Sequence, residues 1–273
     1  MGNIRRWRPR SVSFAACLIC AWLVLGCGGG ESPADPDGGD GVDMALFRDS
    51  AAASTDVTLS LALADSLFDF DPTLDPSMSA EANAALVAAF AEAGLAGCGT
   101  VLVSGATVTV DYGAGCELST GVRASGSVSL TFSKSGSELS VAMTFDMLSV
   151  EERTLDGSAT FVTSDGSTLA VTSMLASGVS ADLVVVGSVG AMQIDGTATV
   201  VRGGATLMLT FTGVVWRQGD CYPSAGTLGV GSGRLVQTVT FSSASASSGV
   251  VTVSQGRASR EATLPPYGDC PAG

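Results

Sequence analysis

The sequence contains no histidine and only one lysine, Lys134, among its 273 residues. Histidine is the commonest general base and metal ligand near neutral pH, so its absence excludes a Ser-His-Asp triad. A Ser–Lys dyad would need Lys134, which we expect in an exposed hairpin tip. Carboxylates that could serve a glycoside hydrolase are present, but no spacing pairs them: Asp111, Asp146, Glu151 and Glu152. We therefore predict no catalytic residue, no metal site, no cofactor and no enzymatic activity.

Positive charge is also scarce. The chain has 26 acidic and 13 basic residues, a net charge of −13. Four of the basic residues are arginines at positions 5, 6, 8 and 10, so residues 27–273 hold nine basic and 26 acidic residues, a net charge of −17. A strongly acidic surface repels phosphate backbones, which excludes nucleic acid as a partner. It also argues against electrostatic docking on anionic lipid head groups.

The N-terminus has the layout of an export signal, with arginines ahead of an apolar stretch over residues 11–25. This stretch is shorter than the roughly 20 residues that a membrane-spanning helix needs. No Ala-x-Ala-like cleavage site follows it. The run Val24-Leu25-Gly26-Cys27 instead resembles the lipobox of bacterial lipoproteins, in which the cysteine becomes the acylated first residue. The alternatives are an unlipidated secretory signal and a transmembrane anchor.

The lipobox resemblance implies that residues 1–26 are a removed signal peptide and that Cys27 is the lipid attachment site. Bacterial lipoproteins carry three acyl chains, such as palmitate, which hold a protein firmly in a membrane. Gly28 replaces the Asp that favours inner-membrane retention, so the resemblance implies the outer membrane, with the domain facing the periplasm or the cell surface. The membrane, reached through this lipid, is the one partner that the sequence indicates; it identifies no protein or small-molecule partner.

Residues 27–43 are rich in glycine, proline and aspartate and contain no apolar face to bury. We expect an acidic flexible tether with a mean span of roughly 20–25 Å. Residues 44–97 form an N-terminal extension with one convincing helix over residues 80–93. Ser79 should cap this helix and Gly94 should end it. The helical spacing predicts a stripe of residues that faces the core: Ala82, Leu86, Ala89, Phe90 and Ala93.

Residues 44–76 show a weaker pattern. The apolar run over residues 57–67 fits one strand or a short helix. The aspartates that follow favour a turn-rich surface loop, with a loose cation site as the alternative: Asp65, Asp69, Asp71 and Asp75.

From Thr100 onward the apolar residues recur with a period of two, as in Val128, Leu130 and Phe132. Polar residues alternate with them, and pairs such as Asp156-Gly157 and Gly203-Gly204 mark turns. We predict a mainly β fold of ten to twelve strands, an antiparallel meander that forms a barrel, a sandwich or a curved sheet. This β domain spans residues 98–273.

Four cysteines remain in the predicted mature domain, an even number in an exported chain. Three pairings exist, and we expect the local one, Cys98–Cys116 and Cys221–Cys270. The first pair brackets two expected strands, residues 100–104 and 106–112, that would pair around Gly105. The cysteines lack the paired C-x2–4-C units of zinc sites.

Two of these cysteines lie in distinctive contexts. Residues 109–116 read T-V-D-Y-G-A-G-C, and residues 221–228 read C-Y-P-S-A-G-T-L. Together they resemble a pattern in β-rich lipoproteins of unknown function from Gram-negative bacteria. The resemblance covers residues 98–270 and implies an exported, β-rich, lipid-anchored domain. It implies no activity.

We therefore expect a membrane-anchored lipoprotein that acts as a non-enzymatic envelope binding or structural module. The first alternative is a carrier of lipids or other hydrophobic ligands that uses the concave face of the sheet, and the second is an extracytoplasmic hydrolase. A carrier needs a lipid-sized cavity. Residues placed equally well on a cavity wall or in an ordinary core are Met143, Phe145, Met147, Leu207, Leu209 and Phe211.

Overall fold

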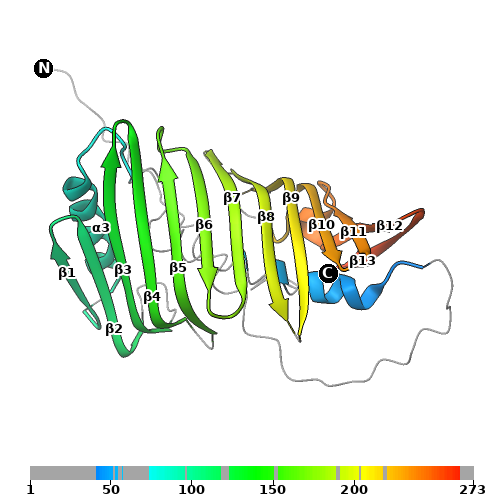
Figure 1. The fold of residues 1–273 in the computed structure, drawn as a ribbon, viewed down its shortest axis with the longest axis horizontal. Helices are drawn as coiled ribbons and strands as arrows, with labels where there is room; N and C mark the ends of the chain where they lie inside the picture. The colour runs from blue at the N-terminus through cyan, green and yellow to red at the C-terminus, as the bar shows by residue number, and fades with distance from the viewer. Residues whose placement is uncertain are drawn as a thin grey trace, which may run out of the picture.

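The structure is a computed structural model that describes residues 41–51, 53–54, 57, 74–95, 97–117, 123–150, 153–188, 191–202, 204–217 and 220–264. Its strands form a single antiparallel sheet in the order β1 to β13, so that each strand pairs only with its neighbours in sequence. The sheet is curved and open, and Figure 1 shows helix α3 behind its β1 end. The expected antiparallel meander is confirmed, and its form is the curved sheet, with thirteen strands instead of the expected ten to twelve.

The strand bounds follow the meander from one edge to the other. They are β1 Thr100–Ser104, β2 Thr107–Glu117, β3 Arg123–Ser135, β4 Glu138–Val150, β5 Arg153–Thr163, β6 Thr168–Leu175, β7 Val179–Ser188, β8 Ala191–Arg202, β9 Ala205–Arg217, β10 Ala225–Ser232, β11 Leu235–Thr240, β12 Val250–Gln255 and β13 Ala258–Thr263. A short helix, α4 Ser245–Ser248, lies between β11 and β12.

Alternation along each strand divides the sheet into an inner and an outer face. In β6, for example, Leu169, Val171 and Leu175 are buried, whereas Ala170 and Thr172 between them are exposed. Successive side chains of a strand point to opposite faces, so the apolar set forms one continuous core along the inner face. The period of two in the sequence therefore located this core correctly over most of the domain.

Bulges interrupt the alternation and correct one expectation. The β3–β4 register shifts between Ser125 and Ser127, and Met147 adopts a positive φ of 47°. Gly126 also has a positive φ, 83°, and a Cβ there would collide with the carbonyl oxygen of Met147. A bulge reverses the face of the residues that follow it. Met147 is therefore exposed on the outer face, and Leu148 takes its place in the core.

Helix α3, Ala80–Gly94, confirms the predicted helix but not its predicted inner face. The backbone N–H of Ala82 donates to the hydroxyl of Ser79 at 3.2 Å, as expected of a cap. The helix ends at Gly94 as expected, but Gly94 does not adopt the left-handed conformation of a glycine cap: Leu95 caps the helix, and the positive φ falls at Gly97.

The predicted stripe is wrong because a neighbouring face of α3, without its two large side chains Leu86 and Phe90, contacts strands β1, β2 and β3. The buried residues of the helix are Asn83, Ala84, Val87 and Ala88, while Leu86 and Phe90 are exposed. Asn83 is buried at no cost in hydrogen bonds, since its amide donates to the backbone oxygens of Asp75 and Ser79, both at 3.0 Å. The face of α3 that packs on the sheet therefore combines two alanines with Val87 and Asn83.

Candidate functional site

A helix over residues 44–51 was not expected from the sequence. The carboxylate of Asp43 accepts the backbone N–H groups of Ala45 at 3.0 Å and Leu46 at 3.1 Å, an N-cap. Leu46, Phe47, Ser50 and Ala51 fall on one buried stripe. The sequence feature that could have predicted this helix is an Asp followed by apolar residues at helical spacing. It lies at the start of residues 44–76, where the overall pattern is weak.

This helix is fixed to the far end of the sheet by a buried amide network. The side-chain amide of Gln237 on β11 donates to the backbone oxygen of Asp43 at 2.6 Å and to the side-chain oxygen of Gln255 at 2.9 Å. The same oxygen of Gln255 accepts the backbone N–H of Asp43 at 2.8 Å. Gln237 is fully buried. Residue 43, where the expected tether ends, is therefore held at β11 and β12.

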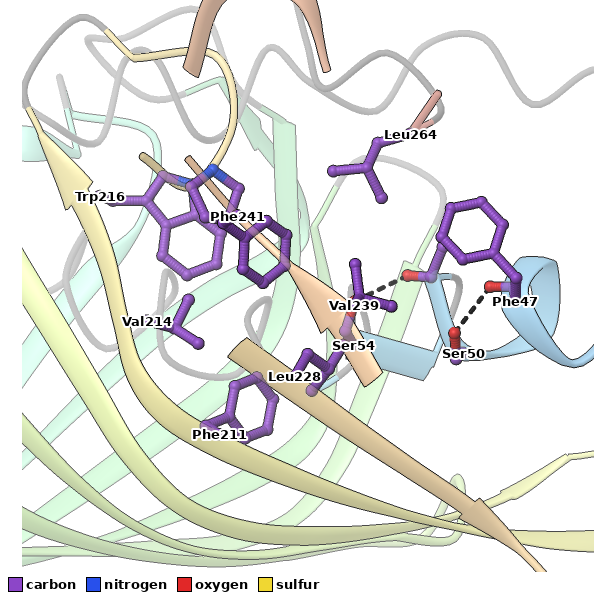
Figure 2. Close-up of a pocket in the computed structure, with 12 residues that line it drawn as sticks. Phe47, Ser50, Ser54, Phe211, Val214, Trp216, Leu228, Val239, Phe241 and Leu264 are labelled. Atoms are coloured by element: carbon purple, nitrogen blue, oxygen red, sulfur yellow. Dashed lines mark hydrogen bonds between the residues drawn. The ribbon is translucent and has the colours of Figure 1, made fainter. Parts of the chain in front are cut away.

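Below this helix, aromatic rings converge on a small cavity (Figure 2). Phe47 lines it from the helix, and Phe241, Trp216 and Phe211 line it from the sheet side. The hydroxyl of Ser50 donates to the backbone oxygen of Phe47 at 2.7 Å and so presents no free donor to the cavity. The free volume is about 10 Å³, at the lower limit for one water molecule. The site is a packed helix–sheet contact.

The structure separates the residues that could have lined a carrier cavity. Five of the six are buried in the core at 3% exposure or less: Met143, Phe145, Leu207, Leu209 and Phe211. Met147 points to the outer face because of the bulge described above. The expectation that Met147 shares a wall with the others is therefore wrong.

The outer face carries a row of hydroxyl groups that the sequence did not reveal as one feature. Following the strand register, one row crosses all thirteen strands, and ten of its positions are Ser or Thr: Ser104, Thr107, Thr131, Ala142, Thr160, Thr172, Asp182, Thr197, Thr210, Gly229, Thr238, Ser254 and Ser259. None of these residues is buried. The hydroxyls of Thr107 and Thr131 are 3.2 Å apart, and neighbouring positions lie about 4.8 Å apart. We call this set the hydroxyl row.

The candidate carboxylates do not form a cleft. Asp111 and Asp146 both pair with Ser127 of the strand between them and are exposed on the outer face. Two strand spacings separate them by about 10 Å. Glu151 and Glu152 lie outside the described residues, as do Asp65, Asp69 and Asp71. Lys134 is exposed near the β3–β4 turn, as expected, and donates to the backbone oxygen of Met78 at 3.1 Å.

Two aspartates with shifted pKa values stabilise turns. Asp165, between β5 and β6, accepts the backbone N–H groups of Thr168 at 2.7 Å and Ser167 at 2.8 Å, and these bonds lower its pKa to about 2. The side chain and backbone of Ser77 similarly lower the pKa of Asp75. Hydrogen bonds favour the charged form in both cases, so both groups have a structural explanation.

One predicted disulfide is present. Cys98 and Cys116 are bonded with their Cα atoms 5.2 Å apart. They enclose β1, as expected, and nearly all of β2, which extends beyond the expected residue 112 and contains Cys116 itself. Cys221 is also disulfide-bonded. Cys270, its expected partner, lies outside the described residues, so that pairing stays a prediction. Cys27 and most of the expected tether also lie outside them, so lipid attachment stays a prediction too.

Within the described part of the chain, no group of three His, Cys, Asp or Glu residues is placed to hold a metal ion. No helix in the same part combines the length and apolarity needed to cross a membrane. Comparison with known proteins finds no matching family model, no matching curated protein and no matching solved structure. The resemblance to Gram-negative lipoproteins therefore stays a prediction from the sequence.

Proposed function

We propose that this protein is an outer-membrane lipoprotein, anchored through acylated Cys27, that acts as a non-enzymatic envelope binding or structural module. The observation that supports this proposal over the carrier alternative is the filled inner face of the sheet. Phe145, Met143 and Leu209 are at most 1% exposed. The aromatic cavity below residues 44–51 has about 10 Å³ of free volume, far below the several hundred Å³ of ligand pockets.

The outer face supports the binding half of the proposal. The hydroxyl row offers donors and acceptors across the full width of the sheet, and most of its positions bear no charge. Such a surface suits a broad contact with a polar partner rather than the burial of an apolar one. The acidic chain would repel polyanions, so we expect a neutral or cationic partner.

Native mass spectrometry of the full-length protein purified from the envelope tests the proposal. We expect the mass of residues 27–273 with three acyl chains and no further lipid. Loss of the acyl mass in Cys27→Ser, with the rest unchanged, would support the anchor. A retained lipid beyond the covalent acyl chains would contradict the filled inner face and favour the carrier.

A binding assay with an apolar dye gives the second measurement. A carrier binds the dye in a saturable manner at its concave face, and binding weakens when a wall residue is truncated. If the protein is the proposed non-carrier module, the native protein binds no dye. Dye binding by the native protein that Phe145→Ala weakens would favour the carrier.

A further inference from the structure

The two edges of the open sheet differ in charge. β13, at one edge, carries exposed Arg260 and Glu261, and charges on an edge strand discourage addition of another strand. β1, at the other edge, reads T-V-L-V-S, without charge or proline. Leu102 on β1 is 65% exposed and Val103 is 50% exposed. β1 therefore has the composition of an edge that accepts a strand.

The turn after β1 fixes which backbone groups face the open edge. Gly105, with φ +59°, is the first residue of a two-residue turn of the type II′ geometry that suits hairpins. Such a turn closes on a hydrogen-bonded pair, here Ser104 and Thr107. Hydrogen-bonded pairs alternate along the ladder, so Leu102 and Thr109 form the next one. At the alternate positions, Val103 and Val101, the backbone groups of β1 point away from β2.

Val101 and Val103 are the residues whose N–H and C=O groups point to the open edge. We propose that β1 pairs antiparallel with β1 of a second copy of this chain, about a two-fold axis at Leu102. In this register Val101 exchanges both backbone hydrogen bonds with Val103 of the second copy, and Leu102 faces Leu102 of the second copy. Thr100 faces Ser104 of the second copy, so that the pattern T-V-L-V-S matches itself when reversed.

This self-matching sequence is the argument for a second copy rather than another protein. A two-fold axis brings identical patches together, so a self-complementary strand is what an isologous interface requires. Apolar side chains then meet on both faces, with Leu102 on the outer face and the two valines on the inner face. Such apolar cross-strand pairs stabilise a sheet.

The charge of the chain is compatible with a second copy as the partner of β1. Two chains of residues 27–273, each with a net charge of −17, repel each other, so an interface between copies must be free of facing acids. The outer-face acid closest in the register is Asp111, which pairs with Thr100. The two-fold axis places Thr100 opposite Ser104 of the second copy, whose neighbour on β2 is Thr107. The acids of the two copies are therefore offset along the strands.

The small area of the β1–β1 contact determines whether the dimer is populated in solution or only on a membrane. A five-residue strand is about 17 Å long, and pairing two of them buries less than the roughly 1,200 Å² typical of stable interfaces. We expect a weak dimer in solution and a populated one on a membrane, where anchoring confines both copies. This step rests on the proposed lipid anchor.

The position of the edge agrees with an anchored chain. The tether would join the domain at Asp43, which is bonded to Gln237 on β11. β1 lies ten strand spacings from β11, about 48 Å along the sheet. Figure 1 shows β1 and the helix after residue 43 at opposite ends of the molecule. The membrane-proximal end and the pairing edge are therefore different parts of the surface.

Cysteine cross-linking in the native envelope tests the pairing. A facing pair without direct hydrogen bonds has its Cα atoms about 4.5 Å apart, within the range of a disulfide. Full-length Leu102→Cys under mild oxidation should give about tenfold more covalent dimer than Val236→Cys, since pairing raises the effective concentration of the thiols. Val236 on β11 is the matched control, because its exposure of 63% is nearly that of Leu102.

A double variant tests the backbone contribution. Val103→Pro removes an N–H that points away from β2, and proline is tolerated on edge strands. Combined with Leu102→Cys, it should reduce the covalent dimer to the level of Val236→Cys. An unchanged melting temperature verifies that the double variant is folded, and the single variant alone decides the proposal if it is not.

Equal dimer yields from Leu102→Cys and Val236→Cys would overturn the proposal, as would cross-linking of Leu102→Cys mainly to a protein of different mass. Fractionation distinguishes this failure from failure of the proposed function. Membrane-bound protein without the cross-link contradicts only the strand pairing. Soluble protein contradicts the anchor. The excess of the Leu102→Cys dimer over the Val236→Cys dimer should then be smaller than tenfold, because the pairing is weak in solution, and equal yields would still overturn the pairing.

Discussion

Truncation of Phe145 to alanine should be among the most destabilising single changes in this domain. Phe145 lies in β4 at 1% exposure, paired with Val128 on one side and Gly157 on the other. Gly157 provides no side chain to move into the space that the ring leaves. A Cβ at Gly157 would itself collide with the backbone oxygen of Met174. The void therefore stays largely open, and the cost should lie in the upper half of the usual range, about 4 kcal/mol.

This free energy converts into a measurable shift. For a domain of this size, 1 kcal/mol corresponds to about 2–4 °C in melting temperature, so Phe145→Ala should lower the Tm by about 8–16 °C. Circular dichroism of the full-length protein in detergent measures the Tm. Phe90→Ala is the matched control, because Phe90 is 49% exposed on α3. The control should cost about 1 kcal/mol or less, since a half-exposed ring loses less transfer energy and leaves no cavity.

Equal shifts for Phe145→Ala and Phe90→Ala would refute the packed inner face. They would mean that the ring of Phe145 borders a space that solvent or a ligand already occupies. The structural-module proposal would then lose its main support.

Three further predictions concern the anchor, the bulges and the turns. Cys27→Ser should abolish incorporation of labelled palmitate and move the protein to the soluble fraction, and a mutant that stays in the membrane would contradict the lipid anchor. Gly226→Ala should destabilise by more than about 2 kcal/mol in denaturant unfolding, because φ is +93° and the added Cβ would collide with the backbone of Gly213. Gly256→Ala, at φ +60° in open space, should cost only about 1–2 kcal/mol, and equal costs would contradict the close approach. The folded pKa of Asp165 lies at about 2, below its ordinary value of 3.8, so its contribution to stability is present above about pH 4 and is lost as the pH falls toward 2. Asp165→Asn should flatten the fall in Tm between these pH values, and an identical pH profile would contradict the assignment.

The sequence predicted the sheet well because its strands are amphipathic. Alternating residues such as Val128, Leu130 and Phe132 determine which face is buried, and turn glycines mark where each strand ends. The pairing of Cys98 with Cys116 followed from two short strands and one turn at Gly105. These features depend on residues close together in the chain, so local pattern suffices to identify them.

Features that depend on tertiary approach were not predictable in the same way. The Met147 bulge arises from its contact with Gly126 on the neighbouring strand, which no pattern within β4 reveals. The inner face of α3 is set by its contacts with β1, β2 and β3, and helical spacing alone favoured another face. The helix over residues 44–51 is stabilised by the distant Gln237. The hydroxyl row exists only when the register of all thirteen strands is known.

The meander also determines the order in which the molecule can be completed. All strand pairing is between sequence neighbours, so β structure can spread hairpin by hairpin with small losses of loop entropy. The bond between Asp43 and Gln255 is different, because 212 residues separate its partners. During synthesis Asp43 emerges long before its acceptor exists. The first helix, residues 44–51, can therefore dock only after strands β11 and β12 have formed, so its docking is one of the last steps of folding.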